Sequence, residues 1–304
     1  MKDTPMLRRD RPDLGSRALR SSSVALGTLL ILAGPAFGAD VAKPEPGTTP
    51  VTRPFGQSAA LQGGGTAASA DLSTVDHNPA GLALGRVVSV EGATAWSKHN
   101  IQSSEVGVVD SVMSSVAAGF KFRQTSSATG DRERRFSLGL ADPIAKSGVI
   151  IGLAGDYKER PKRNEEGLIE DDETAYEMRA GILYQLTDGI RFGARTGGHF
   201  DQNAPKEHAI GVAALLGAHF VASFDQMLSD EKLTKTTGGL GILFAKYLDL
   251  RTSIGYHNLT GRQEGGAGLF LQSNKAALFY VATLPELRGP LVEHQVGIRL
   301  NMIF

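Results

Sequence analysis

The stretch His294-Gln295-Val296-Gly297-Ile298-Arg299-Leu300-Asn301-Met302-Ile303-Phe304 ends the chain and decides the fold. Its apolar residues at every second position are Val296, Ile298, Leu300, Met302 and Phe304, and those between them include Gln295, Gly297, Arg299 and Asn301. In a β-strand, this period places the two sets on opposite faces. A final aromatic residue on the apolar phase is typical of the last strand of an outer-membrane β-barrel, where one face meets lipid and the other a polar lumen. The sequence therefore predicts such a barrel, with Phe304 as its assembly signal.

The same alternation recurs along the rest of the chain. From residue 86 onward, it marks about fourteen segments, of which 176–186, 190–194 and 248–256 are the sharpest. The weakest are residues 102–110 and the run 206–228, which fits either one long strand or two. We therefore predict an all-β fold, a transmembrane antiparallel β-barrel of about fourteen strands over residues 86–304, and twelve strands also fit this length.

A soluble β-sandwich would also alternate, so the connections between strands are needed to separate the two folds. If Phe304 ends in the periplasm, every second connection lies outside, and these connections are long. They are residues 98–103, 124–133, 159–174, 200–207, 227–235, 258–263 and 285–293. The alternate connections, such as 187–189 and 273–275, are short. Long outer loops and tight periplasmic turns are typical of outer-membrane barrels, whereas a sandwich has no reason to sort its loops by parity.

The polar phase of the predicted strands collects charged residues and many glycines. Its candidate lumen-lining residues are Arg179, Arg191, Arg195, Asp249, Arg251 and Arg299. On a barrel these side chains would line a wet or plugged lumen, and on a sandwich they would form the solvated face. A barrel of twelve to fourteen strands is wider than one filled by its own side chains. Water, a plug or a ligand must therefore occupy the interior.

The N-terminus has the pattern of an export signal. Residues 1–20 carry Arg8, Arg9, Arg17 and Arg20, residues 24–33 are apolar, and Ala36-Phe37-Gly38 offers small residues for cleavage. We predict a cleaved signal peptide over residues 1–38, which places the mature protein in the bacterial outer membrane. An uncleaved interfacial helix is the alternative.

Two further segments precede the barrel. Residues 39–56 have little pattern and are predicted to be flexible. Residues 57–85 are rich in small residues and contain Asn78-Pro79-Ala80-Gly81-Leu82. Asn binds nearby backbone, and Pro fixes φ and removes a donor, so the pair can turn the chain from a plug into the wall. We predict a plug over residues 57–85, with Asn78, Pro79, Ala80 and Gly81 as its motif and with Asn78 buried and hydrogen-bonded.

The Asn-Pro-Ala motif, placed between an export signal and the first strand, resembles the FadL superfamily of outer-membrane long-chain fatty acid transporters. The stretch from Gly63 to Leu82 is also similar to the PorV-type branch, which serves secretion machinery. The transport branch implies a fourteen-stranded barrel, an inward-folded hatch, and apolar ligands that leave sideways through a defect in the wall. The mature chain is shorter than a typical fatty acid transporter, and its outer loops lack long apolar excursions.

Composition excludes several classes of function. Lys plus Arg and Asp plus Glu both number 32, so no single-sign field indicates nucleic acid as a partner. The sequence has no cysteine, and its seven histidines show no metal-binding spacing. Neither a phosphate loop nor a G-x-S-x-G elbow is present. We therefore expect no metal, no cofactor and no enzymatic activity.

Two functions fit these observations. The first is passive transport of hydrophobic or small amphipathic molecules across the outer membrane. The alternative is a non-transporting barrel that serves as subunit or anchor of a secretion, motility or envelope complex. The expected partners are outer-membrane lipid and lipopolysaccharide, the barrel assembly machinery, and either a hydrophobic ligand or a protein of such a complex.

Overall fold

The computed structural model describes residues 60, 65–85, 87–97, 102–126, 131–144, 147–163, 169–199, 206–217, 219–244, 247–287, 289 and 292–302. The predicted signal peptide, the segment 39–56 and Phe304 lie outside the described residues, as do residues 57–64 apart from Ala60. Within the described ranges, no helix has the length and apolar character needed to cross a membrane.

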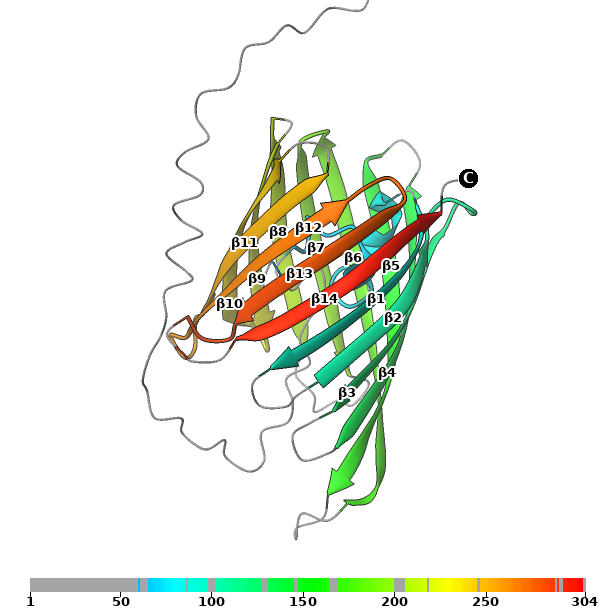
Figure 1. Ribbon diagram of the computed structural model, residues 1–304, viewed down its shortest axis with the longest axis vertical. Coiled ribbons are helices and arrows are strands. Elements are labelled where there is room, and N and C mark those ends of the chain that lie inside the picture. The colour runs from blue at the N-terminus through cyan, green and yellow to red at the C-terminus, as the bar shows by residue number, and fades with distance from the viewer. Residues whose placement is uncertain are drawn as a thin grey trace, which may run out of the picture. The chain divides into compact units, whose positions relative to one another are not determined.

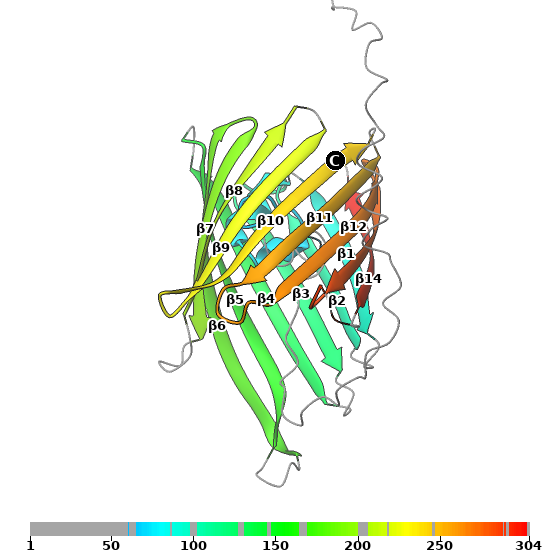
Figure 2. The same cartoon turned by 90° about the vertical axis from the view of Figure 1, so that its left-hand side faces the viewer.

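Fourteen antiparallel strands form one sheet that closes on itself (Figures 1 and 2). β1 pairs with β14, so Val88 lies opposite Met302 and Ser97 lies opposite Glu293. The predicted barrel is confirmed, with fourteen strands rather than twelve. The strands are β1 (Val88–Ser97), β2 (Gln102–Asp110), β3 (Ala117–Ser126), β4 (Arg132–Ile144), β5 (Val149–Arg163), β6 (Ile169–Thr187), β7 (Ile190–His199), β8 (Glu207–Leu216), β9 (Phe220–Ser229), β10 (Lys232–Phe244), β11 (Leu248–His257), β12 (Gln263–Gln272), β13 (Ala276–Leu284) and β14 (Glu293–Met302).

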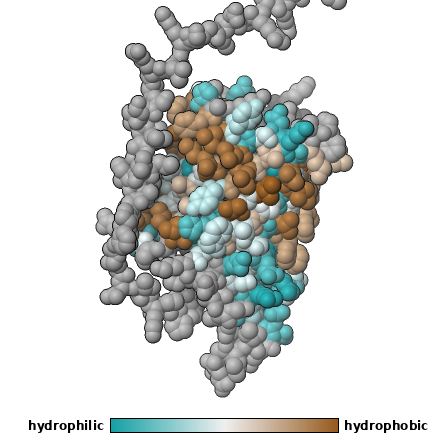
Figure 3. Space-filling model, viewed as in Figure 1, coloured by the Kyte–Doolittle hydropathy of each residue, from teal (hydrophilic) through white to brown (hydrophobic). Residues whose placement is uncertain are grey.

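The two faces of the sheet differ as the alternation predicts. On β14, the exposed fractions of Val296, Ile298, Leu300 and Met302 lie between 36% and 51%. Apolar side chains also cover much of the outer face seen in Figure 3. A soluble protein rarely exposes so wide an apolar surface, whereas a barrel in lipid requires it. A sandwich would bury these side chains between two sheets, so the single closed sheet excludes that alternative.

The predicted loop 159–174 is largely a hairpin, which corrects the sequence analysis. β5 continues to Arg163 and β6 begins at Ile169, so both strands extend beyond their outer neighbours (Figures 1 and 2). The last rung that β5 shares with β4 joins Glu159 to Arg134. Farther out, Arg160 and Glu173 form an ion pair with a distance of 3.0 Å between Nη2 and Oε2. The high charge of this run predicts a loop. Because the charges on the two strands are opposite, they instead favour cross-strand pairing.

The predicted loop 227–235 is shorter than expected. β9 ends at Ser229 and β10 begins at Lys232, so Asp230 and Glu231 alone make the turn. Both residues have positive φ, 48° and 65°, as a two-residue hairpin of matching twist requires. The outer connections are therefore not uniformly long, although the turns at 188–189 and 273–275 on the opposite end are short as expected.

The wall shows no sideways defect within the described strands. Consecutive strands pair rung by rung, and their register shifts only near strand ends, at Lys162/Arg163, Gln185/Thr187 and Leu233/Lys235. The lateral exit that the family resemblance implies is therefore not seen in this part of the chain.

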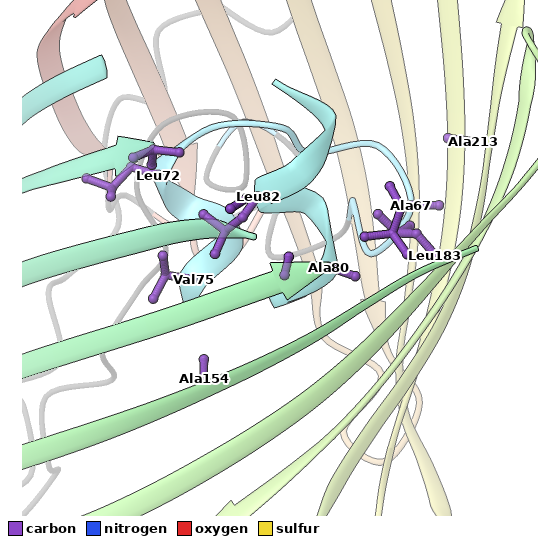
Figure 4. Close-up of a cluster of buried hydrophobic side chains, with 12 residues drawn as sticks. Ala67, Leu72, Val75, Ala80, Leu82, Ala154, Leu183 and Ala213 are labelled. Carbon is purple, nitrogen blue, oxygen red and sulfur yellow. The ribbon is translucent and has the colours of Figure 1, made fainter. Parts of the chain in front are cut away.

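Two short 3-10 helices lie inside the barrel, η1 (Leu72–Val75) and η2 (Pro79–Leu84). We call residues 65–85, which contain both helices, the inner segment. The main apolar core lies between this segment and the inner face of the wall (Figure 4), where Leu72, Val75 and Leu82 are at most 1% exposed. A smaller apolar cluster joins Ala60 to Phe270 and Phe279 on β12 and β13.

Candidate functional site

The inner segment is shaped by the motif that the sequence singled out. Asn78 caps η2, because its Oδ1 accepts a hydrogen bond from the Ala80 N–H at 3.2 Å, and Pro79 occupies the first turn. Asp71 caps η1 in the same way through the N–H of Ser73. In both caps, a side-chain oxygen accepts a hydrogen bond from a backbone N–H of the first turn, which has no acceptor within the helix. The Asn-Pro pair thus starts the helix that leads the chain into β1.

Asn78 also joins the inner segment to itself and to the wall. Its side-chain amide donates to the Thr66 carbonyl at 2.7 Å and to the Ile182 carbonyl on β6 at 3.3 Å. The residue is only 2% exposed. The hydrogen bonds of Asn78 to Thr66 and Ala80 are buried, and a buried donor or acceptor left without a partner is costly.

A belt of inward-facing glycines receives the inner segment. One such glycine lies on each strand from β2 to β8, and at each a Cβ would overlap the inner segment or the residues that hold it. The belt consists of Gly107, Gly119, Gly139, Gly152, Gly181, Gly193 and Gly211. At Gly152 the overlap would be with the backbone of Pro79 and Ala80, and at Gly181 with the Asn78 side chain. Glycine is therefore required by close approach of two backbones.

The register explains how the belt stays level. Gly119 lies opposite Gly139, Gly152 opposite Gly181, and Gly193 opposite Gly211, and each pair is displaced by two residues from the next. Barrel strands are tilted relative to the barrel axis. A displacement of two residues from one strand pair to the next therefore keeps the glycines at about the same height in the lumen. The sequence predicts many glycines on the polar phase of the strands, but their alignment follows only from the register.

Asp76, between η1 and η2, is surrounded by cations of the wall. Its carboxylate contacts Lys121 and forms ion pairs with Arg123 (2.8 Å), Arg135 (3.4 Å) and Arg179 (3.9 Å). The wall supplies two further carboxylates to the same cations, Glu105 to Lys121 and Arg123, and Asp156 to Arg135 and Arg179. One carboxylate of the inner segment thus connects two groups of charged wall residues, and its removal would leave buried positive charge uncompensated.

The charge of Asp76 depends on these cations. Burial alone raises the pKa of its carboxyl, but the four cations together hold that pKa well below its usual value. A group with a depressed pKa in the folded state stabilises that state fully above its unfolded pKa, and the contribution is lost as pH falls through the folded pKa. The contact of Asp76 with the wall is therefore expected to persist through neutral and mildly acidic pH.

This gives a prediction for acid. The sequence has no cysteine, so the variant Ser69→Cys, at a position 3% exposed, carries one thiol that reports when the inner segment leaves the wall. We expect equal labelling rates at pH 7 and pH 5 and a faster rate only below about pH 4. A dipyridyl disulfide, which reacts in acid, measures these rates. The added variant Asp76→Asn should flatten the acid response, and an unchanged response would contradict the assignment.

A second wall carboxylate holds the start of the inner segment. Asp225 on β9 accepts hydrogen bonds from the Gly65 N–H at 2.7 Å and the Thr66 N–H at 2.8 Å. Gly65 has φ of +91°, a conformation in which successive N–H groups can face one anion. Gly65 and Thr66 thus form a cradle for a carboxylate of the chain itself.

Replacing Asp225 by alanine should loosen this end of the segment. Two buried N–H groups would lose a charged acceptor, at a cost of about 1–3 kcal/mol. The labelling rate of the Ser69→Cys thiol should rise by roughly tenfold, because a loss of about 1.4 kcal/mol raises the population of the detached segment tenfold. Asp225→Asn, which keeps one acceptor oxygen, should give a smaller rise. Equal rates in all three proteins would show that Asp225 does not hold the segment.

The structure places the predicted lumen residues on the inner face. Arg179 and Arg195 are buried on β6 and β7, and Arg251 pairs with Asp249 on β11 at 3.0 Å. Arg191 and Arg299 are half-buried on the same phase. Only Arg179 lies in the cluster around Asp76. Four residues of the site were not predicted from the sequence: Asp76, Asp225, Lys121 and Arg135. The last two could have been found, because they lie on the polar phase beside exposed Phe120 and Phe136.

No site for a metal is formed by His, Asp or Glu in the described ranges. No family model and no curated protein matches the sequence.

Solved structures are similar at low sequence identity. The toluene transporter TodX of P. putida matches with a TM-score of 0.59 and 12% identity over 81% of this chain and 98% of that chain. TodX is a FadL-family hydrocarbon transporter. This chain shares the fold of TodX. A deltaS2 mutant of the TodX monoaromatic hydrocarbon channel gives a TM-score of 0.55 at 12% identity, covering 81% and 98%. The KdgM porin gives 0.43 at 9% identity, covering 71% and 100%. The fourteen-stranded barrel that the family resemblance implies is therefore seen in this chain and shared with TodX.

Proposed function

We propose that this protein lets hydrophobic or small amphipathic molecules cross the outer membrane passively and that its inner segment acts as a hatch. The observation that carries the proposal is the way in which the segment is held. A stretch of about twenty residues bridges the wall from β2 to β9 through the glycine belt, Asp76 and Asp225. It is a strap across a wide lumen rather than an independently folded plug.

The chemistry of the contacts supports a movable hatch. Leu72, Val75 and Leu82 pack on glycines of the wall, and four of the seven wall residues in the same apolar cluster are alanines, so few large side chains interlock. The polar anchors are ion pairs and backbone hydrogen bonds, which can be exchanged for water one at a time. Elements that move in function are drawn from such locally held regions. The similar fold of TodX, described as a toluene transporter, favours an apolar substrate.

Uptake of toluene tests the proposal. Asymmetric vesicles with lipopolysaccharide in the outer leaflet, which slows apolar solutes, should take up labelled toluene faster when they contain the full-length protein. Vesicles containing an unrelated barrel of similar size control for leakage at the protein surface. Equal initial rates in the two preparations would end the transport proposal.

The β5–β6 hairpin favours a second function, that of an anchor or subunit in an envelope complex. The ladder of this hairpin continues outward past the rung that joins Glu159 to Thr174, where no described strand flanks it. Such a projecting ribbon offers side chains and backbone to a protein partner. Cross-linking in intact cells through a residue of the exposed pair Arg160 and Glu173 should then return one stoichiometric protein. The absence of such a product would count against this function.

A further inference from the structure

Two arginines lie on the outward face of β4, on the side of the wall that faces lipid. Arg132 and Arg134 are exposed and share one phase of the strand with Phe136 and Leu138. Among the strand residues whose side chains the structure describes, no other lysine or arginine lies on the outward phase. A cation on the lipid-facing side costs little free energy only near the membrane interface. The pair therefore singles out one place on the outer surface.

A row of aromatic side chains lies next to the pair, on the side toward the membrane centre. Phe122, Phe136, Tyr157 and Tyr176 occupy one rung across β3, β4, β5 and β6. The centroids of neighbouring rings are 4.9, 6.1 and 5.3 Å apart. We call these four residues the aromatic row. Such rows lie at the level of the lipid headgroups in outer-membrane barrels, so Arg134, two residues farther out on β4, lies among the headgroups of the outer leaflet.

The guanidinium of Arg134 has hydrogen-bonding capacity left for a ligand. It forms an ion pair with Glu159 on β5, with 3.7 Å between Nη1 and Oε2. The buried pair of Arg123 and Glu105 is much closer, at 2.5 Å. Glu159 also accepts the hydroxyl of Tyr157 at 2.9 Å. Because a guanidinium carries five N–H donors, one loose contact leaves most of them available.

The two arginines can contact one ligand group together. Residues two apart on a strand face have Cα atoms about 7 Å apart, and the long side chains of Arg132 and Arg134 can both bend toward a group between them. Paired N–H groups of arginine match two oxygens of a phosphate. Lipopolysaccharide carries phosphate groups at the level of the headgroups, with several acyl chains directly below them. Its charge and its apolar part thus complement the arginine pair and the aromatic row.

We propose that Arg132 and Arg134 bind a phosphate group of the lipid A part of lipopolysaccharide and that its acyl chains lie against the aromatic row. Leu138, which is 56% exposed, continues this apolar surface toward the membrane centre. β4 lies between β3 and the projecting β5–β6 hairpin (Figure 1), so the bound lipid lies next to that hairpin. The proposal requires a barrel in the outer membrane and does not depend on which solute it transports.

Titration of the purified full-length protein with diphosphoryl lipid A tests the site. In a nonionic detergent, native mass spectrometry measures the fraction of protein that carries the lipid. Arg132→Gln and Arg134→Gln should each weaken binding roughly fivefold, and the double variant should weaken it further. Arg262→Gln is the matched control, because it removes an exposed arginine between β11 and β12, where the Arg262 Nε donates to the Pro285 carbonyl. This control should bind lipid A as the wild-type protein does.

Two further probes identify the group that is recognised. Dephosphorylated lipid A should bind the wild-type protein as weakly as diphosphoryl lipid A binds the double variant, because it lacks the anion. Excess inorganic phosphate should not displace diphosphoryl lipid A, because it lacks acyl chains. Complete displacement by inorganic phosphate would show a site for a free anion and would overturn the lipid proposal. Equal binding of diphosphoryl lipid A by the wild-type protein and the double variant would also overturn it.

Thermal stability gives a second readout on the same proteins. Without lipid, the double variant and Arg262→Gln should have the Tm of the wild-type protein, because the replaced side chains are exposed. A ligand that binds only the folded state raises the Tm with its concentration. Diphosphoryl lipid A should therefore raise the Tm of the wild-type protein and of Arg262→Gln, but not that of the double variant. The same rise in all three proteins would contradict a role for the arginine pair.

Discussion

Replacing Gly152 with leucine is expected to drive the inner segment off the wall and to make the barrel leaky. A Cβ at Gly152 would overlap the backbone of Pro79 and Ala80, which cannot rotate away as a side chain can. Forced overpacking costs about 1–3 kcal/mol, and at the upper value the population of the detached segment rises roughly 100-fold. The thiol of Ser69→Cys should be labelled faster by that factor. Single-channel recordings in planar bilayers should show open events that the wild-type protein lacks.

Gly238 provides the matched control. It lies on the outer face of β10, and a Cβ there would meet no atom within 4 Å. Gly238→Leu therefore adds the same side chain to the same kind of strand, but into lipid, and should leave labelling and conductance at wild-type values. If Gly152→Leu behaved like Gly238→Leu, the segment would not rest on the belt. If both variants leaked, the leak would come from the strands rather than from the segment.

The barrel could be predicted from the sequence because its signal is local. Each strand carries its own alternation, as Val296 to Met302 show, and lipid outside a closed sheet makes that alternation strict. The positions of strand ends are harder to predict from sequence, because a charged run is compatible with both a loop and a paired strand. The run from Glu159 to Glu173 has the composition of a loop, yet Arg160 and Glu173 meet across a ladder. Whether two charged segments pair depends on which residues lie opposite, and one strand alone does not contain that information.

The site was predicted only in part for the same reason. Asn78 and Pro79 form a recognisable local motif, and the sequence marks Arg179 and Arg195 as facing the lumen. The partners of these residues belong to other strands. The alignment of Gly119 with Gly139, or the position of Asp225 under Gly65, follows from register and strand tilt. One glycine per strand on the polar phase, over seven consecutive strands, was a readable signal, because wall positions that face a plug closely cannot carry a Cβ.

Asp76→Ala is expected to have the largest effect of any single change in the inner segment itself. The substitution leaves Lys121, Arg123, Arg135 and Arg179 with only the wall carboxylates, although the side chains of all four are at most 8% exposed. Breaking a buried ion pair from one side costs about 3–5 kcal/mol, which corresponds to a rise of roughly 100- to 4,000-fold in the detached population. The Ser69→Cys thiol again measures this rise.

A surface ion pair separates the effect of burial from that of charge removal. Glu173→Ala removes the partner of Arg160 in a pair whose side chains are 48% and 47% exposed, and such pairs contribute at most about 1 kcal/mol. Its labelling rate should match that of the parent protein. Adding Arg135→Gln to Asp76→Ala removes one uncompensated cation and should recover part of the loss, as expected when the cost is buried positive charge. A double variant no better than Asp76→Ala would mean that the carboxylate acts through its shape rather than its charge, since only an electrostatic cost declines when a cation is removed with it.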